Sequence, residues 1–188
     1  MIRSAIKPLQ GERLFRPSLV RSPPMDIAKS TRHSHITGMF AEALVLYWLS
    51  RDGSECTRVD HTGIDLLANN CRTGSLMGIS VKSRSRSTGT ESTALTWNKD
   101  FHKVDAACAA FRCEPYYAIV VDAGDRIRLF LLSKEHFISA AGVSNRKLNW
   151  GMTKQHLERY RADKEIKCVE FSVSVNCWWD EPRPSRER

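Results

Sequence analysis

Three polar side chains interrupt two apolar segments near the middle of the chain. Asp65 falls within residues 64–68, and Ser80 and Lys82 fall within residues 76–83. A carboxylate and an ammonium group in segments otherwise suited to a core cost free energy unless they find partners. Strand side chains alternate between the two faces of a sheet, so antiparallel pairing of these segments brings all three residues to one side. The spacing therefore predicts one polar cluster on a β-hairpin.

A fourth candidate is Glu42, the one charged residue in ITGMFAEALVLYWL, residues 36–49. A helix apolar nearly all round is expected to be buried, and a buried carboxylate needs a cation or hydrogen-bond donors. An ion pair with Lys82 would meet this need, and so would a divalent metal ion shared with Asp65. Because two nearby carboxylates repel each other unless a cation lies between them, we favour the metal. Oxygen ligands suit Mg²⁺ or Mn²⁺.

The elements that must position these residues follow from hydrophobic periodicity and turn residues. Helices are predicted at residues 36–50, 99–111, 134–141 and 153–161, and strands at 55–59, 64–68, 76–83, 116–121, 126–132 and 166–175. Residues 84–96, rich in Ser, Thr and Arg, are expected to form a loop. This order predicts an α/β fold with a central mixed β-sheet flanked by helices.

The two ends of the chain differ in composition from the middle. Residues 1–33 contain seven Lys or Arg, two Asp or Glu and four of the seven prolines, which predicts a basic, flexible N-terminal arm. Residues 34–178 are predicted to form the folded domain, and residues 179–188 a basic C-terminal tail. The sequence contains no apolar run of membrane-spanning length, no secretory signal and no C-x-x-C pair, so we expect a cytoplasmic protein without a membrane partner.

Three short motifs occur in order on the predicted helix and the two strands of the hairpin: Gly38-Met39-Phe40-Ala41-Glu42, Gly63-Ile64-Asp65-Leu66 and Ile79-Ser80-Val81-Lys82. Together they resemble the PD-(D/E)xK nuclease superfamily, and most of all its archaeal Holliday-junction-resolvase-like branch and related small bacterial endonuclease domains. The resemblance covers residues 34–132. It implies a restriction-endonuclease-like core and Mg²⁺- or Mn²⁺-dependent hydrolysis of phosphodiester bonds in DNA.

The resemblance also implies roles for the residues of the site. Glu42 and Asp65 would bind the metal, and Lys82 would position the attacking water and stabilise charge on the phosphate. Ser80 departs from the family, which usually has Glu or Asp at this metal-ligand position. A neutral hydroxyl is a poor metal ligand and is better suited to holding a metal-bound water. Two readings stay open: an active endodeoxyribonuclease, whose DNA structure preference the sequence does not reveal, and a catalytically degraded DNA-binding protein.

The charge of the chain indicates the partner. A net charge of +8 and a pI of about 9.4 favour a polyanion such as DNA. Arg84, Arg86, Lys99 and Lys103 are expected to contact phosphates, although a solvated loop would have a similar composition. Resolvase-like members act as dimers, so the resemblance also allows a homodimer. An unrelated reading is a protein-interaction domain in which Glu42 and Lys82 form a structural contact.

Overall fold

The computed structural model describes residues 29–87, 89–98, 100–144 and 147–173. Its helices are α1 (His33–Arg51), α2 (His102–Phe111), α3 (Lys134–Ala140) and α4 (Lys154–Ala162). A large sheet contains β1 (Cys56–His61), β2 (Ile64–Asn69), β3 (Leu76–Ser85), β5 (Glu114–Ala123), β6 (Arg126–Ser133) and β9 (Lys167–Ser172). A small sheet contains β4 (Leu95–Asn98), β7 (Gly142–Ser144) and β8 (Lys147–Trp150).

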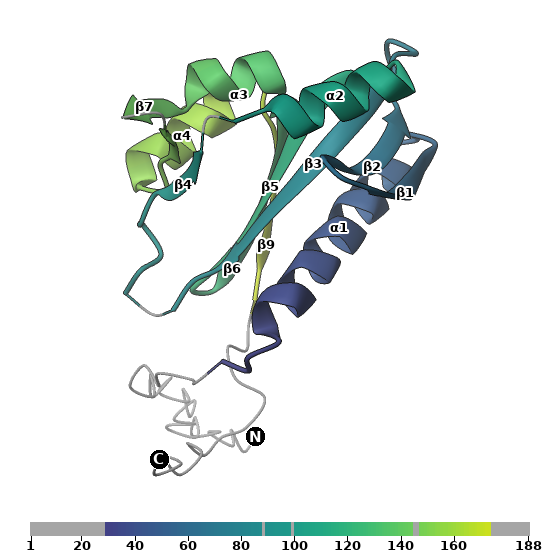
Figure 1. Ribbon diagram of the computed structural model, residues 1–188. Helices are drawn as coiled ribbons and strands as arrows, with labels where there is room; N and C mark the ends of the chain where they lie inside the picture. The colour runs from purple at the N-terminus through teal and green to yellow at the C-terminus, as the bar shows by residue number, and fades with distance from the viewer. Residues whose placement is uncertain (1–28, 88, 99, 145–146, 174–188) are drawn as a thin grey trace, which may run out of the picture.

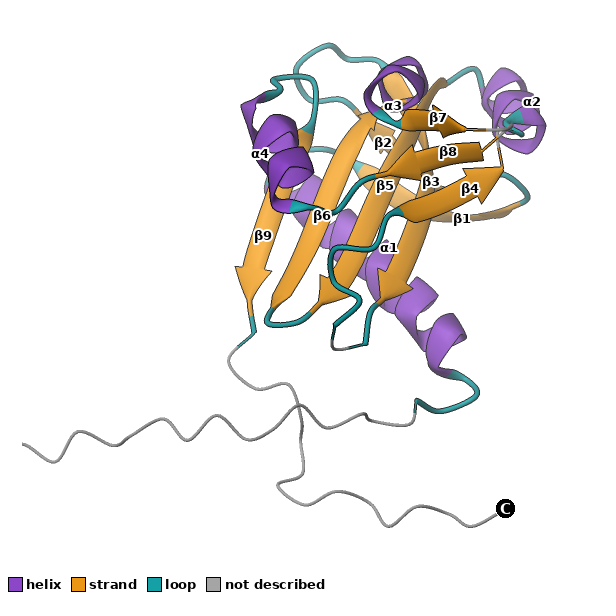
Figure 2. Ribbon diagram, turned by 90° about the vertical axis from the view of Figure 1, so that its left-hand side faces the viewer, coloured by secondary structure: helices purple, strands orange, loops and turns teal. Residues whose placement is uncertain are grey.

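The large sheet is mixed and lies between two layers. Its strand order is β1-β2-β3-β5-β6-β9, and every neighbouring pair is antiparallel except β3 and β5. Helix α1 crosses one face of the sheet, and α2, α3, α4 and the small sheet lie on the other (Figure 1, Figure 2). The predicted α/β fold with a central mixed sheet flanked by helices is therefore confirmed.

Each face of the large sheet has its own apolar core. The core under α1 includes Val45, Leu66 and Ile79, and the core on the opposite face includes Val104, Ile119 and Trp150. Trp150 of the small sheet is fully buried and stacks on Tyr160 of α4 at a ring separation of 4.0 Å. The small sheet was not predicted: residues 142–150 were assigned no element. The loop predicted at residues 84–96 is too long at both ends, because β3 continues to Ser85 and β4 begins at Leu95.

Helix α1 corrects a second prediction. Ala41, Val45 and Leu49 are buried, but the helix is not enclosed on all sides as its composition predicted. Its outer side exposes four large apolar side chains: Ile36, Met39, Phe40 and Tyr47. The apolar residues of α1 therefore divide into one face that packs on the sheet and one face that is exposed. In the part of the chain that the structure describes, no helix is long and apolar enough to cross a membrane.

Helix α2 is fixed against the hairpin of β1 and β2. Gly63 in the turn has a φ of +115°, and a Cβ atom there would lie 2.2 Å from the carbonyl oxygen of Lys103. Only glycine fits this close approach and this backbone conformation without strain. The first turn of α2 therefore rests on the turn that leads into Asp65.

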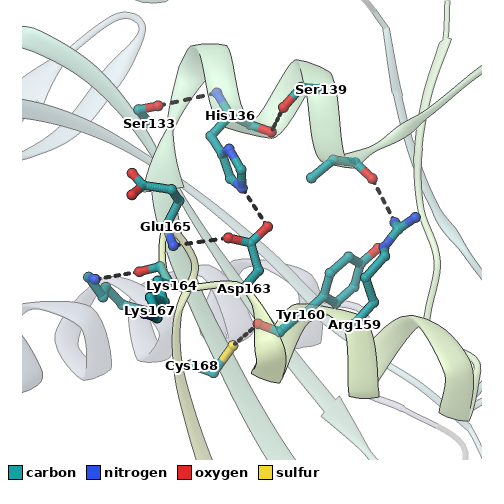
Figure 3. Close-up of polar contacts among 11 residues, drawn as sticks. Ser133, His136, Ser139, Arg159, Tyr160, Asp163, Lys164, Glu165, Lys167 and Cys168 are labelled. Atoms are coloured by element: carbon teal, nitrogen blue, oxygen red, sulfur yellow. Dashed lines mark hydrogen bonds and ion pairs between the residues drawn. The ribbon is translucent and has the colours of Figure 1, made fainter.

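A polar contact joins α3 to the segment after α4 (Figure 3). His136 Nε2 lies 2.8 Å from Asp163 Oδ2, and the backbone N–H of Glu165 donates to Asp163 Oδ1 at 3.0 Å. Slight burial raises the pKa of Asp163, but the hydrogen bonds from Glu165 and His136 lower it, and the net pKa lies below its usual value. The charged form of Asp163 thus stabilises this junction.

We predict that Asp163→Asn lowers the free energy of unfolding by about 1 kcal/mol at pH 7, since it weakens a charge-assisted hydrogen bond. Because the folded-state pKa of Asp163 is depressed, its contribution is present above the unfolded-state pKa of about 3.9 and is lost as the pH falls through the folded value. Urea unfolding at pH 7 and pH 3 should show the difference from wild type shrinking in acid. Glu158→Gln, on the exposed side of α4, is the control and should change little; equal effects of both variants would contradict the assignment.

Candidate active site

Asp65 lies where β2 and β3 separate. The two strands pair from Asn69 opposite Leu76 to Leu66 opposite Ile79, and the pairing stops there. Beyond this point Asp65 Oδ2 accepts a 2.6 Å hydrogen bond from the backbone N–H of Val81. We call this opening, bounded by Asp65 on β2 and Val81 on β3, the fork. A side-chain carboxylate thus occupies the acceptor position that a strand carbonyl would otherwise fill.

The fork also departs from regular strand alternation. Ile64 belongs to the core on the α2 side, whereas Leu66 belongs to the core under α1. Residues two apart on a regular strand would share a face, so β2 is irregular at Asp65. This irregularity allows the Asp65 carboxylate to point toward β3.

Ser80 and Lys82 lie next to the fork on one face of β3. Their neighbours in register on β5 are Tyr117 and Ile119, which belong to the core on the α2 side. Ser80 is 1% exposed, and its Oγ accepts a 2.8 Å hydrogen bond from Lys82 Nζ. The structure therefore brings together the three hairpin residues that the sequence placed in one cluster.

Glu42 approaches from the α1 side and has a different partner from the one expected. It forms an ion pair with Arg58 of β1, and its side chain is 25% exposed. Arg58 is opposite Leu66 in the β1–β2 register, so it faces α1. The Glu42–Lys82 ion pair considered from the sequence is not formed, because Lys82 lies on the other face of the sheet and an arginine is nearer.

The Asp65 carboxyl connects the two sides electrostatically. Burial raises the pKa of Asp65 above its usual value, while the Val81 N–H and the Lys82 ammonium lower it. The Glu42 carboxylate raises the pKa of Asp65 further, and the Arg58 guanidinium lowers it. Asp65 is therefore within electrostatic reach of Lys82 on one face and of the Glu42–Arg58 pair on the other.

Lys82 is perturbed in the opposite sense. Burial lowers the pKa of Lys82, Asp65 raises it, and Arg84 lowers it again. Its one hydrogen bond within the described residues goes to a neutral hydroxyl, so the ammonium keeps donors for another acceptor. A partly buried acid and a partly buried base with perturbed pKa values are found more often at functional sites than elsewhere.

The predicted DNA-contacting residues have different surroundings. Arg84 is exposed two positions after Lys82 on the same side of β3, and Lys103 is exposed on α2. Arg86 donates to two carbonyl oxygens of the following loop at 3.0 Å each, so it holds that loop in place. Lys99 lies outside the described residues, and α2 begins only at His102.

The metal-ligand chemistry of the site is limited to few donors. Among the described residues, no three His, Cys, Asp or Glu side chains form a group that could hold a metal ion. Asp65 has one carboxylate oxygen engaged by the Val81 N–H, and Glu42 has one engaged by Arg58. Ser80 offers a neutral hydroxyl. Since Mg²⁺ keeps several waters and often binds through one or two carboxylates, this set fits a weakly held hydrated ion.

Comparisons with known proteins find similarity among solved structures. No family model matches the chain, and no curated protein matches it either. Among solved structures, the chain is similar to Hjc, a Holliday junction resolvase from the archaeal hyperthermophile Archaeoglobus fulgidus. The alignment covers 65% of this chain and 88% of that chain, with 17% sequence identity and a TM-score of 0.46.

The electrostatic coupling in the fork can be measured without any assay of activity. In metal-free buffer, Glu42→Gln should lower the pKa of Asp65, because Glu42 raises it. Lys82→Met should raise the pKa of Asp65, because the ammonium lowers it. A ¹³C-carboxyl NMR titration of Asp65 measures both shifts. Glu55→Gln is the matched control and should leave Asp65 unchanged; an Asp65 titration identical in all variants would mean that these groups do not meet.

Proposed function

We propose that the protein is a metal-dependent DNA endonuclease that hydrolyses phosphodiester bonds, with Glu42, Asp65 and Lys82 as its catalytic residues. The observation that supports this function is the coupling of Asp65 and Lys82 at the fork. Both groups are partly buried. Burial raises the pKa of Asp65 and lowers that of Lys82, and each group opposes the other's shift through its charge. A structural ion pair would be expected to join the two groups directly, but Lys82 donates to Ser80 instead.

Each residue has a distinct role in this proposal. The Lys82 ammonium donates hydrogen bonds to a phosphate oxygen and to the attacking water, and Ser80 orients it. Asp65, held by the Val81 N–H through one oxygen, presents its other oxygen to the reacting groups. A Mg²⁺ or Mn²⁺ ion held by Asp65 and Glu42, with Ser80 acting through a water, would supply Lewis-acid neutralisation of the phosphate charge.

DNA is the substrate class that the charge distribution favours. The chain has a net charge of +8, and Arg84 continues the positive charge of Lys82 along β3 toward solvent. Arg84, Arg86, Lys99 and Lys103 remain the proposed phosphate contacts around the site. A homodimer, which the resemblance allows, can be tested by light scattering on the full chain.

Lys82→Met should reduce the rate of DNA cleavage by about 100-fold or more, since it removes a preorganised positive group from the reacting phosphate. The measurement is cleavage of supercoiled plasmid and of a four-way junction in Mn²⁺, with binding followed separately by fluorescence anisotropy. Binding should change only a few-fold. Lys154→Met removes an equal charge from a side chain that is 92% exposed on α4, and it should cleave normally. A Lys82→Met protein as fast as wild type would refute the catalytic role.

A second candidate, a DNA-binding protein with a degraded catalytic site, is favoured by two observations. Glu42 is engaged by Arg58, and Ser80 supplies no negative charge. For this candidate, wild type would give no heat of Mn²⁺ binding and would bind DNA equally well in chelator and in Mn²⁺. A protein-interaction domain would instead lack the steep salt dependence of DNA affinity that phosphate contacts produce.

Mn²⁺ calorimetry on three variants separates the first two candidates. If the site is active, wild type binds Mn²⁺, Asp65→Asn abolishes the heat, and Arg58→Met tightens binding because it releases Glu42. The matched control is Arg72→Met on the β2–β3 turn, whose side chain is exposed and which should leave Mn²⁺ affinity unchanged. If neither wild type nor Arg58→Met gives a heat of Mn²⁺ binding, the nuclease proposal is refuted and the DNA-binding candidate is favoured.

A further inference from the structure

A small cavity opens where β6, β9 and α4 meet, and β6 is the second strand from β3 in the sheet order. Its volume is about 200 Å³. Two apolar side chains from the core on the α2 side contribute to its wall: Phe130 and Leu157. Three charged side chains also line it: Arg128, Arg161 and Glu170. The cavity thus combines an apolar wall with two guanidinium groups, and the proposed catalytic roles use none of these residues.

The charges at this cavity are unbalanced. Glu170 accepts hydrogen bonds from Arg126 at 2.8 Å, from Arg128 Nε at 2.9 Å and from Arg161 at 2.6 Å. Three guanidinium groups therefore share one carboxylate, and Asp125 approaches only the outermost of them, Arg126, at 3.5 Å. This arrangement leaves an excess of positive charge where Arg128 is only 16% exposed.

Arg128 has unused hydrogen-bonding capacity at this position. A guanidinium carries five N–H donors in a planar fork. Within the described residues, Arg128 donates a hydrogen bond through Nε alone. Its two terminal nitrogens keep the geometry that binds a phosphate through two parallel hydrogen bonds. A partly buried arginine with both terminal nitrogens available is suited to an anionic ligand.

The register of the sheet places this cavity on the same face as Lys82. Arg84 is opposite Val121 on β5, Val121 is opposite Arg128 on β6, and Arg128 is opposite Glu170 on β9. Residues opposite each other in adjacent strands point to the same face. Two strand spacings separate β3 from β6, which is about 10 Å. Arg84 and Arg128 therefore lie on the same face of the sheet as Lys82, with the buried Val121 between them.

We propose that the Arg128–Arg161 cavity binds a second phosphate group of the DNA whose reacting phosphate lies at Lys82. The proposal relies on the proposed function for the identity of the partner. Arg128 holds the phosphate through its terminal nitrogens and Arg161 adds a second charge, while the apolar wall packs against the deoxyribose. Glu170 occupies the anionic position when DNA is absent, and it competes with the phosphate for the same guanidinium groups.

A purely structural role for these residues is the alternative, and the two variants Arg128→Gln and Glu170→Gln distinguish the readings. If Arg128 binds a DNA phosphate, Arg128→Gln should lower DNA affinity about tenfold and reduce the slope of log affinity against log salt by about 0.9. Glu170→Gln should tighten DNA binding, because it removes the competing carboxylate. If Glu170 merely ties β6, β9 and α4 together, its removal lowers stability and brings no gain in affinity.

The experiment measures binding of a fluorescent 20-base-pair duplex by anisotropy across a salt series. Arg72→Gln, which removes one exposed arginine from the opposite end of the β2–β3 hairpin, is the matched control and should keep the wild-type slope. Arg128→Lys covers the case in which Arg128→Gln fails to fold, and it should keep the slope while losing affinity. Slopes for Arg128→Gln and Arg72→Gln that agree, or a Glu170→Gln protein that binds no more tightly, would overturn the proposal.

Two further measurements separate this proposal from neighbouring ones. Calorimetry with deoxyadenosine monophosphate tests a free nucleotide as the source of the phosphate. If Arg128 variants lose binding of the mononucleotide but keep the wild-type DNA slope, the proposal of a DNA contact is overturned. The cleavage rate of the Lys82→Met protein tests the catalytic proposal alone. The salt slope of the Arg128→Gln protein tests the phosphate contact alone, because DNA binding can be measured whether or not the site cleaves DNA.

Discussion

The hydrogen bond from the Val81 N–H to the Asp65 carboxylate is the interaction on which the candidate site depends. It ends the ladder between β2 and β3 without leaving a backbone donor unsatisfied, which would be costly in a partly buried position. It also fixes the carboxylate in the opening between the strands. There the carboxylate is influenced by Lys82 on one face of the sheet and by Glu42 and Arg58 on the other. Without this hydrogen bond, the Asp65 carboxylate would not be held between the charged groups on the two faces of the sheet.

The site holds its charges at some expense of stability. Burial shifts the pKa of Asp65 and of Lys82 toward their neutral forms, so the folded protein disfavours both charges relative to water. A fold selected for stability alone would pair the two groups closely or replace them with apolar residues. Ser80 instead gives the ammonium a neutral, buried partner. The arrangement is understandable if a further anion completes it.

Part of the hairpin cluster could be predicted because its logic is local. Strand alternation placed Ser80 and Lys82 on one face of β3, whereas Asp65 reaches β3 through an irregularity in β2 that alternation does not predict. The partner of Glu42 could not be predicted in the same way, because Arg58 reaches it through the β1–β2 register, which includes an irregularity. The arginine in a short strand next to the hairpin was the available signal. Apolarity around α1 did not reveal which side the sheet would cover. The small sheet was missed because β4 pairs with a strand far along the chain, and β7 and β8, although neighbours in the chain, are only three and four residues long.

The parallel pairing of β3 with β5 has a consequence for how the protein folds. The β2–β3 and β5–β6 hairpins are local, and such hairpins form within about 1–10 μs. The nine register pairs between β3 and β5, however, form only when the crossover of residues 86–113 is closed. Closing this crossover costs chain entropy before the contacts can compensate for it. Ser80 and Lys82 acquire their buried surroundings only at that step. A folding intermediate with both hairpins but without this junction would already hold Asp65 against Val81 and would still leave the lysine in water.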